Sequence, residues 1–355
     1  MKCLIGKTHS QQINDPNSHW WAFIATLLIL MSSAAFSKAD DTTARLTLVD
    51  QYSTSFANKT IPFRVQATGV RDGAVQCVHS AAGRTISRQE VTIKRNEPVR
   101  FELKLPPVRD GITFSTTLTF TLLARGNSTP VDTLAHELWL FPPNPITGQR
   151  ESLEALNITL FDPDGATDAV FQEIDLPFKR VRSLPEPPAT DDDAGVLVIG
   201  EGVSLRRQRS LMPQLFTLAL KGTRIVILAP EDGAFEIPGL GGDGVASSVH
   251  FHRSDVIKQF DKRFDATSWI GVHGSLPATG LAIESTLGRI KGVVTHDAAA
   301  WPWLNIQMPM PSGSVTYCGL RLISNWKSGP TPRFLLIKML QSLARNESAT
   351  ERDSQ

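Results

Sequence analysis

Gly195–Gly200, with the sequence GVLVIG, is the stretch that decides the fold of the C-terminal half of this 355-residue chain. It is a continuous apolar run bounded by glycines, and a helical pattern follows it from Leu205 to Leu220. A second apolar run, Arg224–Ala229, comes directly after that pattern. Strands without polar alternation, separated by a helix, are typical of a parallel sheet that is buried on both faces. The sequence therefore predicts an open, mostly parallel α/β domain over residues 195–345.

The rest of this domain carries weaker patterns. A glycine-rich loop is expected over 233–244, and a helix with one-sided apolar residues is expected from Phe334 to Leu343. The polar tail 346–355 is expected to be disordered. Further strands are predicted at 248–252, 267–272, 287–295, 303–308 and 314–320.

The segment 41–150 has a different texture, because its apolar residues alternate with polar ones in short runs. Val99–Leu105 is the clearest of these runs, with apolar residues on one face and charged residues on the other. Several such runs, separated by Gly/Asp turns, indicate an antiparallel β-sandwich. Between the two domains, residues 151–194 are rich in Pro and Asp, which favours an exposed linker.

The N-terminus indicates export. An apolar stretch over residues 20–36 follows a polar, basic start, and small residues lead to Ala39. This pattern predicts a secretory signal peptide over 1–39 and a secreted or periplasmic protein. The alternative is a membrane anchor formed by residues 20–36, because that stretch approaches the length needed to span a bilayer.

Charge and cysteine content exclude several classes of function. The chain has 36 basic and 35 acidic residues and no basic stripe with interleaved aromatics, which argues against a nucleic-acid partner. Only Cys77 and Cys318 would remain after signal cleavage, in different predicted domains, which argues against a disulfide framework. No sequence pattern indicates a cofactor, and no spacing of ligands indicates a metal site.

Several acidic and histidine residues follow predicted strands of the α/β domain, at the edge where open α/β sheets bind ligands. Two interpretations of this set are open: the residues form a polar crevice, or they are unrelated loop residues. Four are candidate catalytic residues for acid–base chemistry, namely Glu201, His273, His296 and Asp297, and two are candidate ligand-binding residues, Glu231 and Asp232.

Two further features are candidate ligand contacts. Gly200 and Gly202 follow a strand as phosphate-binding glycines do, although the third glycine of that motif is missing. Trp301 and Trp303 flank a proline, and loop aromatics of this kind either bind a ligand or partner or pack in the core.

The order of the predicted elements resembles class I glutamine amidotransferase-like domains. These elements are Gly195–Gly200, a helix at Leu211–Leu220, Arg224–Ala229, a late strand ending in Gly319-Leu320 and a terminal helix that begins with proline. This order is most similar to the non-catalytic version at the ends of secreted bacterial family-2 glycoside hydrolases, behind an immunoglobulin-like β-sandwich. The catalytic barrel of those hydrolases has no room in this chain. An active amidotransferase needs a cysteine on a strand-to-helix elbow, and Cys318 lies within a predicted strand.

The sequence thus favours an exported, non-catalytic interaction or scaffold protein with a protein or carbohydrate partner. The resemblance supplies the link to carbohydrates. The alternative is a hydrolase that uses the strand-end carboxylates and histidines.

Overall fold

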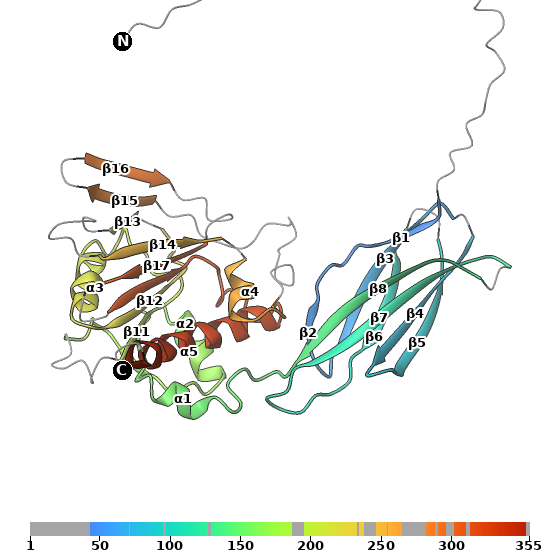
Figure 1. The fold of residues 1–355 in the computed structure, drawn as a ribbon, viewed down its shortest axis with the longest axis horizontal. Coiled ribbons are helices and arrows are strands. Elements are labelled where there is room, and N and C mark those ends of the chain that lie inside the picture. Colours follow the sequence, from blue (N-terminus) through green and yellow to red (C-terminus); the bar gives the residue numbers. More distant parts are fainter. Residues whose placement is uncertain are drawn as a thin grey trace, which may run out of the picture. The chain divides into compact units, whose positions relative to one another are not determined.

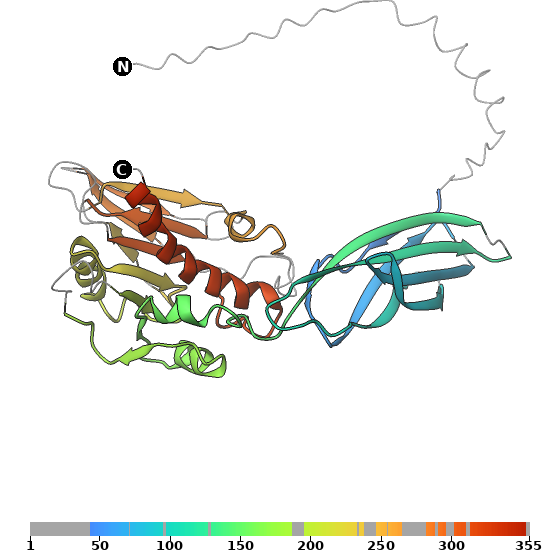
Figure 2. The same cartoon turned by 60° about the horizontal axis from the view of Figure 1, so that its bottom comes forward.

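A computed structural model of the chain combines β-rich and α/β structure, as the sequence predicts at this coarse level (Figure 1). Figure 2 shows the same elements turned by 60°. The residues that the structure describes are 43–70, 72–94, 97–126, 129–186, 195–232, 234–237, 246–253, 255–264, 282–287, 290–295, 302–309 and 313–352.

Two β-sheets make up the N-terminal half of the described chain. In both sheets neighbouring strands are antiparallel, except that β2 and β8 run parallel. One sheet has the order β1 (Arg45–Leu48), β3 (Thr60–Thr68), β6 (Val99–Lys104). The other has the order β2 (Thr54–Phe56), β8 (Pro130–Phe141), β7 (Phe114–Ala124), β4 (Gly73–Ala81), β5 (Arg84–Thr92).

The two sheets share one apolar core, because their strands alternate as predicted. Residues of β6 are buried and exposed in turn, with the valine, phenylalanine and leucine buried. Phe63 of β3 and Phe101 of β6 each lie within 6 Å of Phe120 of β7, with ring centroids 5.4 and 5.6 Å apart. Alternation on a pleated strand thus places one apolar face of each sheet against the other.

His79 of β4 is an exception within this core. Its side chain is fully buried, and neither ring nitrogen has a hydrogen-bond partner. Burial lowers the pKa of the imidazole from its ordinary value of 6.5, so the ring is held neutral. Because both nitrogens lost water without gaining a partner, His79 costs stability.

Replacing this side chain with an apolar one is therefore expected to stabilise the protein. We expect His79→Leu to raise the free energy of unfolding by about 1–3 kcal/mol at pH 7.5. The gain should grow as the pH falls below 6.5, because there the unfolded histidine takes up a proton that the buried one refuses. Urea denaturation at several pH values measures both effects.

His136 is the matched control, because its Nε2 lies 2.9 Å from the carbonyl oxygen of Tyr52. His136→Leu removes a satisfied group and should not stabilise the protein. Equal gains for both histidine variants, or a His79→Leu gain that is the same at pH 5.5 and 7.5, would contradict this account.

A seven-stranded sheet forms the centre of the C-terminal half. Five neighbouring strands of this sheet are parallel, namely β10, β9, β11, β12 and β18, and β17 is antiparallel to both of its neighbours, β18 and β14. Its order is β10 (Lys179–Val181), β9 (Thr159–Phe161), β11 (Val196–Ile199), β12 (Arg224–Leu228), β18 (Ser314–Cys318), β17 (Trp303–Gln307), β14 (Ser248–His252). The predicted pairing of the two apolar runs is confirmed, since β11 and β12 are parallel neighbours.

Helices cover both faces of this sheet (Figures 1 and 2). The helix α3 (Leu211–Leu220) packs on the face formed by Leu197, Ile225 and other odd-numbered residues of β11 and β12. The opposite face packs against four helices: α1 (Arg150–Glu154), α2 (Ala166–Glu173), α4 (Val256–Phe260) and α5 (Pro330–Arg352). β11 is apolar throughout, and so is β12 after its first residue, Arg224, because neither face of these strands meets water.

The prediction of a linker over 151–194 is wrong for its first thirty or so residues. They contain most of α1, then β9, α2 and β10, and β9 is hydrogen-bonded to β11 inside the seven-stranded sheet. Turn-forming Asp, Pro and Gly residues separate these elements, and each strand is only three residues long, so the sequence shows no strand periodicity here. Residues 187–194 lie outside the described chain.

Three smaller predictions also need correction. The tail is helical up to Arg352, because Glu, Ala and Arg within it favour helix. The strand predicted at 287–295 is replaced by two antiparallel strands, since Leu287 ends β15 (Ala282–Leu287) and Ile290 begins β16 (Ile290–Thr295). The predicted loop 233–244 contains β13 (Ala234–Ile237), which pairs with β15. The strand predicted at 267–272 lies outside the described residues.

The predicted signal peptide, 1–39, also lies outside the described residues. Among the helices that the structure describes, none combines the length and the apolar character needed to cross a membrane.

Candidate functional site

The order of the parallel strands creates a crevice at the carboxyl edge of β9 and β11. After β9 the chain adds β10 on one side, and it then crosses to the other side to form β11. The segments that leave β9 and β11 therefore diverge, and open α/β sheets bind ligands at such a switch point.

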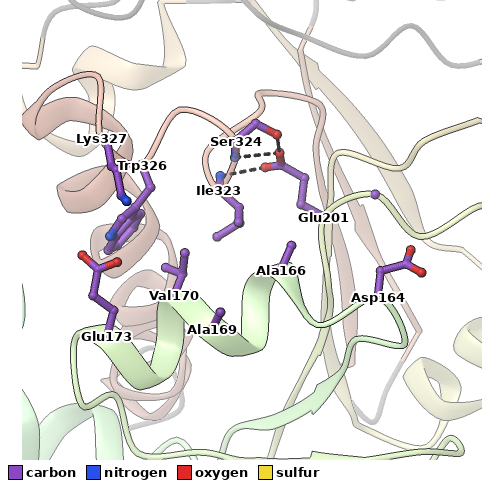
Figure 3. Close-up of a pocket in the computed structure, with 11 residues that line it drawn as sticks. Asp164, Ala166, Ala169, Val170, Glu173, Glu201, Ile323, Ser324, Trp326 and Lys327 are labelled. Atoms are coloured by element: carbon purple, nitrogen blue, oxygen red, sulfur yellow. Dashed lines mark hydrogen bonds between the residues drawn. The ribbon is translucent and has the colours of Figure 1, made fainter.

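A cavity of about 560 Å³ lies at this point (Figure 3). One wall is the face of α2 that carries Ala166, Ala169, Val170 and Glu173, whose spacing places them on one side of the helix. The other wall is the turn between β18 and α5. The lining residues are Asp164, Ala166, Ala169, Val170, Glu173, Glu201, Gly202, Ile323, Ser324, Trp326 and Lys327.

Glu201 lines the cavity beside the turn between β18 and α5. Glu201 is only 6% exposed, and its carboxylate accepts three hydrogen bonds. The Ile323 amide donates to Oε2 at 2.7 Å, the Ser324 amide donates to Oε1 at 2.9 Å, and the Ser324 hydroxyl also donates to Oε1. Figure 3 shows the side chain reaching across to the turn that holds both residues. Glu201 thus fastens the exit of β11 to the exit of β18.

The backbone on either side of Glu201 is also fixed. The Gly200 amide donates to the carbonyl of Phe161 in β9, and the Gly202 amide donates to the carbonyl of Ala229 after β12. The Glu201 amide donates to the hydroxyl of Thr167 in α2 at 2.9 Å. These bonds hold the start of the Glu201 side chain at the centre of the crevice.

The backbone geometry explains why glycine stands at positions 200 and 202. A Cβ on Gly200 would lie 2.8 Å or less from three side-chain atoms of Asp162. Gly202 has a φ of 90°, in the region that favours glycine, and it lines the cavity. Of the two glycines predicted to bind a ligand, only Gly202 borders the cavity.

Two buried carboxylates lie at the start of α2. One oxygen of Asp162 accepts from the Asp168 amide at 2.8 Å, and one oxygen of Asp168 accepts from Gln172 and Arg180. The second oxygen of each carboxylate is buried without a partner. Within the described part of the chain, no three His, Cys, Asp or Glu side chains are grouped so that they could hold a metal ion.

Glu231 and Asp232, the two acidic candidates for ligand binding, are not among the residues that line this cavity. Glu231 forms an ion pair with Arg207, and Asp232 accepts from the Ser204 hydroxyl. The Ser204 hydrogen bond holds the pKa of the Asp232 carboxyl below its ordinary value. These pairs join the loops after β11 and β12, a role for which nearby arginines are well suited.

Trp303 is not an exposed ligand contact, because it is 1% exposed and packs in the core of the sheet. Its ring centroid is 5.1 Å from that of Phe260, and its Nε1 donates to Asn305. The other predicted site residues lie outside the described chain, namely Trp301, His273, His296 and Asp297.

Cys318 lies in β18 and has no exposed surface, as expected for a core position rather than an elbow. Burial raises the pKa of its thiol, so a thiolate nucleophile is disfavoured there. Burial likewise raises the pKa of the Cys77 thiol to about 12.

Sequence reasoning missed the partners of Glu201. Ile323 contributes a backbone amide, which any residue other than proline possesses, so its identity carries no signal. Thr167 and Asp162 follow β9, and recognition of that strand would have placed them at the same edge of the sheet as Glu201.

No family model and no curated protein sequence matches the chain. Weak structural similarity is found to a family 76 glycoside hydrolase from a bovine Bacteroides thetaiotaomicron strain, with 10% identity over 36% of this chain and 24% of that one, at a TM-score of 0.22. The fibronectin(III)-like modules of Clostridium thermocellum CbhA align with 16% identity over 28% of this chain and 96% of that one, at 0.18.

A cycloisomaltooligosaccharide glucanotransferase from Paenibacillus sp. aligns over 71% of this chain and 33% of its own, with 12% identity and a TM-score of 0.23. TM-scores this low carry no argument about the fold or the function of this chain.

Proposed function

We propose that this chain is an exported, non-catalytic interaction protein and that the cavity between α2 and the β18–α5 turn is its binding site. The observation that carries the proposal is the set of hydrogen bonds that the Glu201 carboxylate accepts. Glu201 lines the cavity, and three donors from the β18–α5 turn engage both oxygens of its carboxylate. A group bound in this way fixes the walls of a pocket rather than moving a proton.

The finer description of the fold belongs to the same proposal. We interpret the two N-terminal sheets with a shared core as a β-sandwich that spaces or docks the second part of the chain. We interpret the C-terminal sheet as an amidotransferase-like open α/β domain. The turn after β11 begins with a glutamate, and the only described cysteine of the domain is buried in a strand.

The proposal of an exported protein with a protein or carbohydrate partner rests on the sequence. Its test has two arms. Binding of an oligosaccharide panel and of proteins from the same extracellular compartment is measured by calorimetry with the full chain after signal removal. Turnover of ester and amide substrates is measured in parallel. Binding without turnover is the expected result, and turnover without binding would overturn the proposal.

The alternative function is a hydrolase, and one observation favours it. The Ser324 hydroxyl lines an open cavity and donates to a carboxylate, an arrangement that can assist attack by an oxygen nucleophile. In that case Ser324→Ala should abolish hydrolysis of an activated ester, whereas Ser328→Ala, which alters a serine outside the cavity lining, should leave it intact. Equal, background-level rates for the wild type and both variants would exclude this role for Ser324.

A further inference from the structure

Ile323 and Ser324 present three hydrogen-bond donors to a single point in the cavity. Two are successive backbone amides in a turn, and the third is the Ser324 hydroxyl. Successive N–H groups in a turn form concavities that bind anions. The Ile323 nitrogen lies 2.7 Å from Oε2 of Glu201, and the Ser324 nitrogen lies 2.9 Å from Oε1. Two donors that reach different oxygens of one carboxylate suit a planar ligand with two acceptor atoms.

The group that fills this cradle comes from a distant part of the chain. Glu201 is 122 residues from Ile323 in sequence, and it is almost completely buried at this place. In the described part of the chain its carboxylate forms no ion pair, so neutral donors alone replace its lost water. A carboxylate from another molecule reaches the same donors only when it displaces Glu201.

The surroundings of the cradle suit an amphipathic ligand. Ala169, Val170 and Ile323 supply apolar walls, and Lys327 is the only basic side chain among the residues that line the cavity. Figure 3 shows Lys327 at the end of the cavity remote from Asp164. Its ammonium group attracts a ligand anion and offsets part of the repulsion by Glu173 and Asp164, which also line the cavity.

We propose that the Ile323–Ser324 cradle is a binding site for small carboxylates and that the chain's own Glu201 keeps it filled. A ligand carboxylate competes with Glu201 for the same three donors, and its apolar part lies between α2 and the turn. This proposal names the class of ligand that the cavity binds. It rests on the proposed function in one respect, namely that this cavity is the binding site.

Removing the internal competitor tests the inference. Glu201→Ala empties the cradle, and Glu201→Gln keeps it filled with a neutral side chain of similar size. The thermal midpoint of each variant and of the wild type is measured with sodium butyrate, and with sodium chloride at the same ionic strength. We expect 100 mM butyrate to raise the midpoint of Glu201→Ala by about 2–4 °C. Butyrate should bind the wild type and Glu201→Gln at least about tenfold more weakly.

Two controls define the chemistry. Glu231→Ala removes an exposed carboxylate outside the cavity and should not gain a butyrate effect. Sodium phosphate, which is tetrahedral, should stabilise Glu201→Ala less than butyrate does.

A butyrate effect of equal size on Glu201→Ala and Glu231→Ala would overturn the inference, and so would a stronger effect of phosphate. If Glu201→Ala is largely unfolded in chloride, its folded fraction at a fixed temperature should rise with butyrate concentration, and no rise up to the highest soluble concentration would also contradict the site. The hydrolysis and partner-binding assays described above are independent of these titrations, so the two proposals can fail separately.

Discussion

Ile227→Ala and Leu228→Ala are each expected to lower the free energy of unfolding by about 2–5 kcal/mol. Both side chains are fully buried, although they are neighbours in β12 and point to opposite faces of the sheet. Ile227 packs in the cluster that includes α3, and Leu228 packs in the cluster that includes α2 and α5. Each truncation removes buried carbon atoms and leaves a space that the covering helices fill only in part. Urea denaturation of the two variants measures the losses.

Ile86→Ala is the control, because this isoleucine lies on β5 and is 39% exposed. The same chemical change there should cost less than about 1 kcal/mol. If one of the two β12 variants behaved like Ile86→Ala, only one face of the strand would be covered. The interpretation of the GVLVIG stretch and its neighbour as a doubly covered sheet would then be wrong.

Glu201→Ala is expected to lower the free energy of unfolding by about 2–4 kcal/mol in chloride buffer. The substitution removes the acceptor of two backbone amides and one hydroxyl. Buried donors that lose their acceptor are costly, and the adjoining cavity admits water that compensates for part of the loss. The loss is measured by urea denaturation at constant ionic strength.

Glu231→Ala again serves as the matched control. It breaks an exposed ion pair with Arg207, for which a cost of less than about 1 kcal/mol is expected. A Glu201→Ala loss no larger than that of Glu231→Ala would mean that the carboxylate does not fasten the two strand exits together.

The sequence predicts the centre of the α/β fold because β11 and β12 are covered on both faces. Such strands are apolar at every buried position, and an unbroken apolar run is visible without any knowledge of their neighbours. The alternation of Val99–Lys104 was informative for the related reason that one of its faces meets water. The three-residue strands β9 and β10 are too short to show either pattern, so their segment resembled a linker.

The candidate site was predictable only in part. Glu201 could be found because it follows a recognisable strand, and the carboxyl edge of a parallel sheet is where ligands bind. The donors that engage it could not be found, because two are backbone amides in a turn that is remote in sequence. Glu231 and Asp232 also follow a strand, but they do not line the cavity, and Arg207 and Ser204 engage them instead.

Amide hydrogen exchange at Ile323 and Ser324 tests most directly whether Glu201 joins the exits of β11 and β18. In the wild type both amides donate to a buried carboxylate, so they should exchange slowly. In Glu201→Ala both should exchange at least about tenfold faster, whereas in Glu231→Ala, which loses only an exposed ion pair, both should stay slow. Equal exchange rates at Ile323 and Ser324 in the two proteins would contradict the account.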